Sequence, residues 1–217
     1  MLVEQINRMK NLMLMEAKMV TFNQPNGNFV ILAGGPGAGK SYVSQHFIDL
    51  DNVKPFNVDN YRVGMAKKLW GDDWKEMIST DEGYKTILDL THTTSDPRNV
   101  TIQFLKNFLE SERKEPTNIV YDAGGGQEKV MKDIIKLAEE NGFVVSIVHV
   151  VTELEKALER NLERDRSLPP EMVVDYHDKV KNAVGNLVPY VDNYWVIDNT
   201  QDLAPSERPL GRIHQLK

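Results

Sequence analysis

One eight-residue stretch, GGPGAGKS at residues 34–41, carries the clearest chemistry in the sequence. Its glycines allow successive backbone N–H groups to turn toward an anion, at φ angles that side chains resist. Lys40 adds a positive charge for the β- and γ-phosphates of a nucleotide, and the Ser41 hydroxyl is suited to ligate Mg²⁺. The stretch fits the pattern G-x-x-x-x-G-K-[ST] and lies between an apolar run and a helix-like segment. It therefore predicts a nucleotide-phosphate site, against the alternative of a glycine-rich turn with an incidental lysine.

Two charged side chains follow the next short apolar segment, in the sequence NVDNYR at residues 57–62. A carboxylate such as Asp59 can accept a proton from an attacking hydroxyl, or orient that hydroxyl. Arg62 comes three residues later, one helical turn on, where a guanidinium can grip an anionic acceptor. Asp59 is equally suited to cap the helix that follows, and the two roles are compatible.

A second candidate carboxylate, Asp122, lies in the run IVYDAGGG at residues 119–126. An acid at the end of an apolar strand can hold Mg²⁺ or its water in nucleotide-binding proteins. The three glycines that follow indicate a close backbone approach or a mobile turn. Many strands end in Asp, so the predicted site role of Asp122 depends on the phosphate loop beside it.

Three arginines gather near a proline-bounded break, in the sequence ERNLERDRSLPPEM. Arg160 and Arg164 are four residues apart and share one helix face, and Arg166 follows in the loop. Together they suggest a lid that closes over phosphates and neutralises developing charge. The alternative is a solvated surface on which Glu159 and Glu163 are their ion-pair partners.

Alternating strands and helices must position these side chains. Such alternation favours a mostly parallel sheet with helices on both faces. Ligands bind an open parallel sheet at the carboxyl ends of its strands, where Lys40, Asp59 and Asp122 fall. The predicted strands cover residues 29–33, 54–58, 117–122, 143–151 and 194–198, and the predicted helices cover residues 40–50, 127–140, 153–164 and 170–187.

The remaining segments lie outside this alternation. Residues 66–116 form an insertion between the second and third strands, with a helix predicted over 100–109. Trp70 and Trp74 either pack this insertion or offer a stacking platform for a base or sugar. Residues 2–20 have the spacing of an amphipathic helix, which either packs on the core or binds a protein partner. The predicted units are an N-terminal helix and linker (1–27), a core domain (28–198) with its lid (160–170), and a polar, loosely ordered tail (199–217).

Composition narrows the class of protein. The chain has 217 residues, 41% of them hydrophobic, which suffices for one sizeable core. Its net charge of −6 gives no broad basic footprint for nucleic acid, and the insertion carries eight Lys and Arg against ten Asp and Glu. No cysteine is present, which fits a reducing cytosol. We expect no membrane segment, a cytoplasmic location, and a core role for His149.

The motifs GGPGAGKS, VDNYR, IVYDAGGG and RNLERDRSLPP together resemble the small P-loop kinases that include polynucleotide 5′-kinases and zeta-toxin kinases. The similarity in order and spacing covers residues 29 to about 198. It implies a P-loop NTPase-type three-layer sandwich with a five-stranded mostly parallel sheet, extended by the N-terminal helix and the helical insertion. Asn60 stands where that group has a second acid, and Ala-Gly-Gly-Gly follows Asp122 where a threonine-containing segment is common.

The resemblance implies ATP and Mg²⁺ as cofactors and assigns roles to individual residues. Asp59 activates the attacking hydroxyl, Arg62 positions the acceptor, and Asp122 belongs to the acceptor or metal side. Lys40 and Ser41 handle phosphate and Mg²⁺, and the lid arginines Arg160, Arg164 and Arg166 cover ATP. The remaining cofactor-binding residues are those of the loop and the helix start: Gly35, Pro36, Gly37, Ala38, Gly39 and Tyr42.

The predicted activity is transfer of the γ-phosphate of ATP to an alcohol. The acceptor stays open among a nucleic-acid 5′-OH, a nucleotide sugar and another small molecule. The alternative is an ATP-hydrolysing binding or remodelling module without a phosphoryl acceptor. An acid at the end of the second strand and an arginine lid favour the kinase, because a plain hydrolase needs neither.

Overall fold

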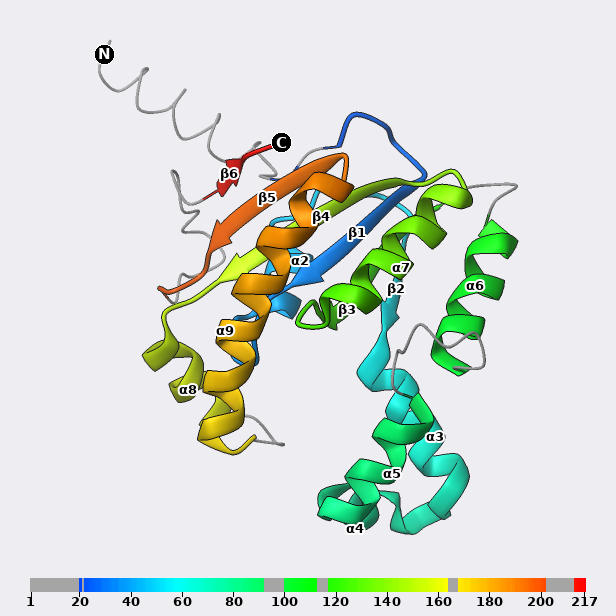
Figure 1. The fold of residues 1–217 in the computed structure, drawn as a ribbon, viewed down its shortest axis with the longest axis vertical. Coiled ribbons are helices and arrows are strands. Elements are labelled where there is room, and N and C mark those ends of the chain that lie inside the picture. Colours follow the sequence, from blue (N-terminus) through cyan, green and yellow to red (C-terminus); the bar gives the residue numbers. More distant parts are fainter. Residues whose placement is uncertain (1–19, 21, 92–99, 113–116, 164–167, 202–212) are drawn as a thin grey trace, which may run out of the picture.

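The computed structural model describes residues 20, 22–91, 100–112, 117–163, 168–201 and 213–217. At its centre is a six-stranded sheet in the order β2-β3-β1-β4-β5-β6 (Figure 1). Five strands are parallel, and only β6 pairs antiparallel to its neighbour. The strands are β1 (Asn28–Ala33), β2 (Val53–Asn57), β3 (Asn118–Gly124), β4 (Val144–Val151), β5 (Asn193–Asp198) and β6 (Ile213–Gln215).

The central strand β1 is buried along its whole length. Its sequence, NFVILA, is almost continuously apolar, as expected for a parallel strand covered on both faces. It pairs with β3, from Phe29 opposite Ile119, and with β4, from Asn28 opposite Val144. The end of β1 leads directly into the glycine-rich loop, so the core of the sheet positions that loop.

Helices cover both faces of the sheet, which confirms the predicted three-layer arrangement (Figure 1). One layer contains α6, α7 and α9, whose apolar residues join one core cluster with Phe29, Ile31 and Tyr121. The other contains α2, which packs with Val30 and Leu32 in a second cluster. The helices are α2 (Lys40–His46), α3 (Val58–Trp70), α4 (Trp74–Ser79), α5 (Asp81–Thr91), α6 (Val100–Glu112), α7 (Glu128–Glu140), α8 (Leu154–Leu162) and α9 (Pro170–Leu187), with short 3-10 turns η1 (Gly71–Asp73) and η2 (Val188–Tyr190).

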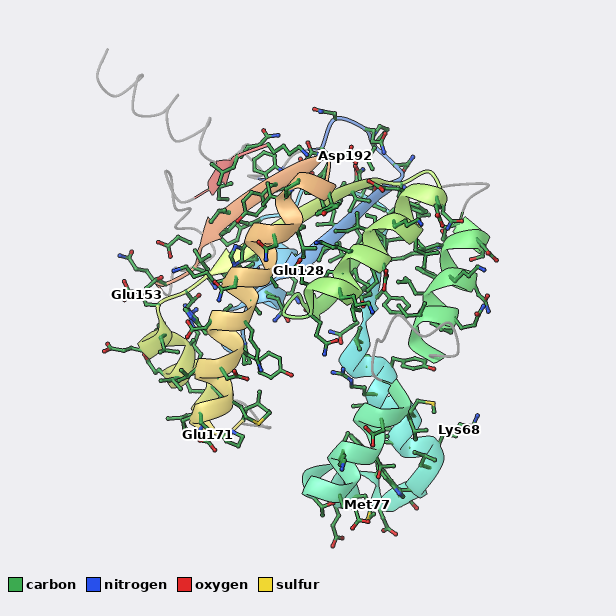
Figure 2. The ribbon with its side chains drawn as sticks, viewed as in Figure 1. Lys68, Met77, Glu128, Glu153, Glu171 and Asp192 are labelled. Carbon is green, nitrogen blue, oxygen red and sulfur yellow. The ribbon has the colours of Figure 1, made fainter. Side chains whose placement is uncertain are left out.

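Helices α3, α4 and α5 extend away from the sheet as a separate arm, in which Lys68 and Met77 are labelled (Figure 2). The arm has its own small cluster of the buried residues Ala66, Ile78 and Ile87. Trp70 and Trp74 pack against this cluster, which confirms that they pack the insertion. The insertion is more helical than expected, because α3 starts at the end of β2 and α4 and α5 follow it.

Of the two expectations for the ends of the chain, the structure tests only the one for the tail. The predicted N-terminal helix lies outside the described residues. Within the predicted tail, β6 pairs with β5, and the backbone N–H of Tyr194 donates to the Lys217 carbonyl at 3.1 Å. The end of the tail is thus part of the sheet. Among the described helices, none combines the length and apolarity that a membrane crossing requires.

Candidate functional site

The glycine-rich loop runs from the end of β1 to the start of α2. The backbone N–H of Gly34 donates to the Gly124 carbonyl at 3.1 Å, which ties the loop to the end of β3. Gly37 and Gly39 have φ angles of +77° and +82°, in the left-handed region that favours glycine. A Cβ atom on Gly37 would lie 2.2 Å from the Ala157 carbonyl oxygen. The sequence therefore needs glycine here for both its conformation and its packing against α8.

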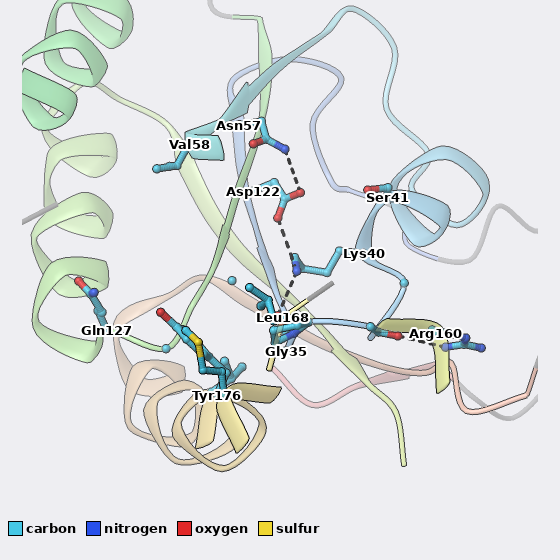
Figure 3. Close-up of a pocket in the computed structure, with 18 of the residues that line it drawn as sticks. Gly35, Lys40, Ser41, Asn57, Val58, Asp122, Gln127, Arg160, Leu168 and Tyr176 are labelled. Atoms are coloured by element: carbon cyan, nitrogen blue, oxygen red, sulfur yellow. Dashed lines mark hydrogen bonds and ion pairs between the residues drawn. The ribbon is translucent and has the colours of Figure 1, made fainter. Parts of the chain in front are cut away.

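Lys40 and Asp122 meet at the centre of the site (Figure 3). The Lys40 Nζ donates to the Gly34 carbonyl at 3.1 Å and lies 3.9 Å from Asp122 Oδ1. The other carboxylate oxygen of Asp122 accepts from Asn57 Nδ2 at 3.3 Å. Side-chain exposures of 18% for Lys40 and 20% for Asp122 leave both groups accessible to a ligand. The structure thus joins the ends of β1, β2 and β3 through three polar side chains.

The start of α3 brings the acidic segment to the same edge of the sheet. Asn57, the last residue of β2, caps this helix, because its Oδ1 accepts from the Asn60 N–H at 3.2 Å. The alternative that Asp59 is the capping residue is therefore wrong. Asp59 is the second residue of α3, and its side chain lies outside the described set. Arg62 lies one turn further along α3 and lines the cavity described next.

A cavity of about 450 Å³ opens over the loop. On one side it reaches Arg160 of α8, and on the other it continues past Lys40 to Asp122 and Arg62. The predicted site residues that line it are therefore close together. The full lining is Gly34, Gly35, Pro36, Gly37, Gly39, Lys40, Ser41, Asn57, Val58, Arg62, Asp122, Gly124, Gly126, Gln127, Met131, Arg160, Leu168, Met172, Tyr176 and Val180.

Arg160 is the only predicted lid arginine within the part of the chain that the structure describes. Its Nη1 donates to the Asn199 carbonyl at 2.8 Å and to the Gly37 carbonyl at 3.5 Å. Arg164 and Arg166 lie outside the described residues. Asn161, which is 1% exposed, exchanges two hydrogen bonds with the Leu168 backbone. That buried amide holds the two ends of the predicted lid segment together.

Two titratable groups near the site are held neutral by burial. Burial raises the pKa of Tyr121, which lies beside Asp122 in the sequence, so its phenol stays protonated. Burial, with the nearby His177 as a smaller cause, lowers the pKa of His149 to about 4. The His149 ring lies 3.1 Å from the Tyr194 hydroxyl through Nδ1, and its side chain is buried. These contacts agree with the predicted core role of His149.

The two residues predicted to hold a cation, Ser41 through its hydroxyl and Asp122 through its carboxylate, both line the cavity. Within the described ranges, no group of three or more His, Cys, Asp or Glu side chains is placed to hold a metal. Mg²⁺ bound with a nucleotide takes much of its coordination from phosphate oxygens and water, and needs only one or two protein oxygens. The pair therefore fits Mg²⁺ delivered with a nucleotide better than a metal held by protein alone.

Several residues of the site were missed from the sequence. Asn57, Gln127 and Tyr176 line the cavity, and Asn199 contacts the loop from the end of β5. Tyr176 lies on the stripe that predicts α9, so its spacing indicated a core position. Its neighbour in space is the glycine turn after β3: a Cβ on Gly126 would lie 3.8 Å from Tyr176 Cδ1. The run of glycines was the available signal that a helix approaches that turn.

Comparison with protein families matches residues 29–182 to the family described as AAA domain. Among solved structures, the chain is similar to one in the Pnkp1/Rnl/Hen1 RNA repair complex, with a TM-score of 0.53 and 18% identity over 79% of this chain and 49% of that one. It thus spans about half the length of that protein. The chain is also similar to one in the PezAT toxin-antitoxin system of Streptococcus pneumoniae, with a TM-score of 0.52 and 13% identity over 90% of this chain and 77% of that one. A third similar structure is AvrRxo1-ORF1:-ORF2 with ATP, with a TM-score of 0.53 and 17% identity over 82% of this chain and 56% of that one. These likenesses confirm the predicted P-loop NTPase-type fold.

Proposed function

This chain belongs to the AAA domain family, and from that premise we propose that it is an ATP-dependent phosphotransferase with an alcohol acceptor. The observation that carries the proposal is the extent of the cavity. It begins at the phosphate loop and continues past Lys40 to Asp122 and Arg62, at the ends of β3 and β2. A site that only hydrolyses ATP needs room for a nucleotide and a water, whereas this one offers polar side chains to a second substrate.

The proposed reaction follows from these positions. The acceptor hydroxyl oxygen attacks the γ-phosphorus of ATP, and the bond to the β–γ bridging oxygen breaks to release ADP. Asp59, in the first turn of α3, orients the hydroxyl and takes its proton. Lys40 and the backbone N–H groups of the loop stabilise charge on the phosphoryl oxygens. Most of the rate then comes from positioning and electrostatics.

Ser41 and Asp122 are the residues proposed to hold Mg²⁺ together with the nucleotide. When bound, the ion would neutralise charge on the β- and γ-phosphates. Asp122 is oriented for such a role by Asn57, which donates to one of its oxygens. Arg62, on the acceptor side of the cavity, is suited to an anionic group of the acceptor.

The acidic charge of the chain favours a small acceptor, or the end of an oligonucleotide, over a long polynucleotide. The chain has a net charge of −6, and the arm that borders the site contains six acidic residues from Asp72 to Asp89 alongside its lysines. A polynucleotide track needs successive cationic contacts to phosphates. Acceptors that place one hydroxyl and one anionic group near Asp59 and Arg62 are therefore the first to test.

The test is to incubate the protein with γ-labelled ATP, Mg²⁺ and a panel of 5′-OH oligonucleotides, nucleosides and nucleotide sugars. We expect label on one class of acceptor. Robust release of inorganic phosphate with no labelled acceptor would overturn the proposal and favour the ATP-hydrolysing module.

A matched pair of variants separates chemistry from folding. Asp59→Ala is expected to abolish transfer while ATP still binds, because the proposed role concerns only the acceptor hydroxyl. Asp72→Ala, an exposed acid in η1 of the same arm, is expected to retain transfer. Loss of ATP binding in Asp59→Ala would instead assign a structural role to that residue.

The alternative function remains an ATP-driven binding or remodelling module. The tie between Lys40 and the Gly34 carbonyl is equally compatible with it, since both functions hold phosphate. An ATPase rate that a macromolecule stimulates, without any phosphorylated product, would favour this alternative.

A further inference from the structure

The backbone carbonyl of Ala38, inside the phosphate loop, is held by two side chains from outside the loop. Asn199 Nδ2 donates to this oxygen at 2.8 Å, and Thr152 Oγ1 donates to it at 3.2 Å. Asn199 follows β5 and Thr152 follows β4, so the two donors come from neighbouring strand ends. Both residues are buried, with exposures of 8% and 6%. We call Thr152 and Asn199 the carbonyl clamp.

We propose that the carbonyl clamp fixes the direction of the Ala38–Gly39 peptide, so that the Gly39 N–H points to the phosphates of bound ATP. The described peptide bonds include no cis bond, and a trans peptide places its C=O and N–H on opposite sides. Drawing the Ala38 carbonyl toward the strand ends therefore turns the Gly39 N–H the other way, toward the cavity that Gly39 lines. Thr152 and Asn199 are thus positioning residues.

The conformation at Gly39 makes such an external hold necessary. Its φ of +82° is open to glycine but not imposed by it, because glycine populates both signs of φ with similar ease. Without a fixed carbonyl, this peptide can rotate and lose the N–H from the anion nest. The Asn199 amide also fills the adjoining space, since a Cβ on Gly39 would lie 2.2 Å from its Nδ2.

The clamp is itself anchored by backbone contacts. The Asn199 N–H donates to the Val151 carbonyl at 2.8 Å, which extends the β4–β5 pairing by one residue. His177 Nε2 lies 2.9 Å from the Thr152 carbonyl, which can only accept, so α9 also holds this segment. Arg160 donates to the Asn199 carbonyl at 2.8 Å. The two donor residues are therefore held in place by contacts within the fold, independently of a bound nucleotide.

The test measures ATP affinity directly, by calorimetry with Mg²⁺, and so needs no knowledge of the acceptor. Asn199→Asp has the same shape but replaces the donor with an oxygen that repels the Ala38 carbonyl. We expect it to bind ATP about tenfold more weakly than the unmodified protein at about pH 8, as the loss of one buried hydrogen bond implies.

Two controls separate positioning from general damage. Asn193→Asp makes the same change at the opposite end of β5, where the amide donates to the Ser146 hydroxyl, and should bind ATP normally. At the second donor, Thr152→Val should weaken ATP binding and Thr152→Ser, which keeps the hydroxyl, should restore it. Circular dichroism verifies that each variant is folded.

The inference is overturned if Asn199→Asp binds ATP as tightly as the unmodified protein at about pH 8. If that variant does not fold, the comparison of Thr152→Val with Thr152→Ser tests the inference instead. Equal ATP affinity of these two variants overturns it. We infer the clamp for the nucleotide site proposed above, on which it rests. Failure of the unmodified protein to bind ATP would sink that function as well, whereas normal binding by every variant would sink the clamp alone.

Discussion

The phosphate loop and the helical arm face each other across the cavity, and they are built in opposite ways. The loop is held by residues in β3 and α8 and by residues that directly follow β4 and β5, all in the main core. The arm is held chiefly by itself, through a cluster of Ala66, Ile78 and Ile87. One half of the site is thus fixed by the whole fold, while the other half rests on a small local core. We infer that the half proposed to bind the nucleotide is constrained by the whole fold, and that the half proposed to bind the acceptor is constrained mainly by the arm itself.

The largest expected difference between the two regions comes from the same substitution made in each. Gly37→Ala would place a Cβ 2.2 Å from the Ala157 carbonyl at a φ of +77°, so we expect ATP affinity to fall by more than about 100-fold and the melting temperature to drop. Gly64→Ala, in α3, meets no atom within 4 Å and should stabilise the helix by about 0.5 to 1 kcal/mol. Calorimetry and thermal melting check both. Normal ATP binding by Gly37→Ala would show that the loop is less constrained than its packing indicates.

A cavity in the arm core tests whether the arm is energetically separate. Ile87 is fully buried, so Ile87→Ala should cost about 2 to 5 kcal/mol of local stability. Hydrogen exchange should become faster in α3 and α5 but not in β1, and ATP affinity should change by less than about twofold. The control Leu90→Ala, on the same helix but 40% exposed, should have a small effect. Faster exchange in β1 would mean that arm and sheet unfold together.

The stability of the sheet should depend on pH through His149. His149 has a pKa of about 4 when folded and an ordinary value of 6.5 when unfolded, so the unfolded chain binds the extra proton between these values. Stability should therefore fall as the pH drops below 6.5, by about 2 kcal/mol at about pH 5. His149→Gln, which does not titrate, should remove this slope in denaturant melts. An unchanged slope would mean that other groups cause it.

The smallest effect is expected where α6 joins the sheet edge. Lys54 of β2 donates to Glu112 at 2.6 Å, and hydrogen bonds from Lys54 and then Thr117 lower the pKa of Glu112. Because the folded pKa is the lower one, this stabilisation is present above the ordinary carboxyl value and is lost as the pH falls through the folded value. Glu112→Gln should cost about 1 kcal/mol near neutral pH, since half-exposed Lys54 is partly screened. A urea melt measures it, and a larger loss in acid than at neutral pH would contradict the assignment.

Local patterns were enough to predict the five parallel strands and the loop. The five parallel strands appear as apolar runs, and the phosphate loop is a contiguous motif whose glycines and lysine need no distant partner to be recognised. The ends of β2 and β3 were also correctly placed beside it, because parallel strands end at the same edge.

Contacts between distant residues explain what was missed. Asn57 caps α3 in place of Asp59 because β2 ends one residue earlier than expected, and a boundary shift of that size leaves no mark in composition. Asn199 reaches Ala38 across 161 residues of sequence, so nothing local to either residue indicates their pairing. The strand β6 has three residues, too few for a period to be detected. The arm helices α4 and α5 are short and separated by a single residue, which hid them inside the insertion.

The place of β1 in the sheet order has a consequence for how the chain acquires its structure during synthesis. Both of its partners come later, since Asn28 is hydrogen-bonded to Asn118, 90 residues further on, and pairs with Val144. While a ribosome makes the segments between them, the most apolar strand has neither neighbour, whereas the arm needs only local contacts. The arm can therefore form first. Until β3 and β4 are made, NFVILA is an unpaired apolar strand, and it is the segment that most needs protection by a chaperone against aggregation.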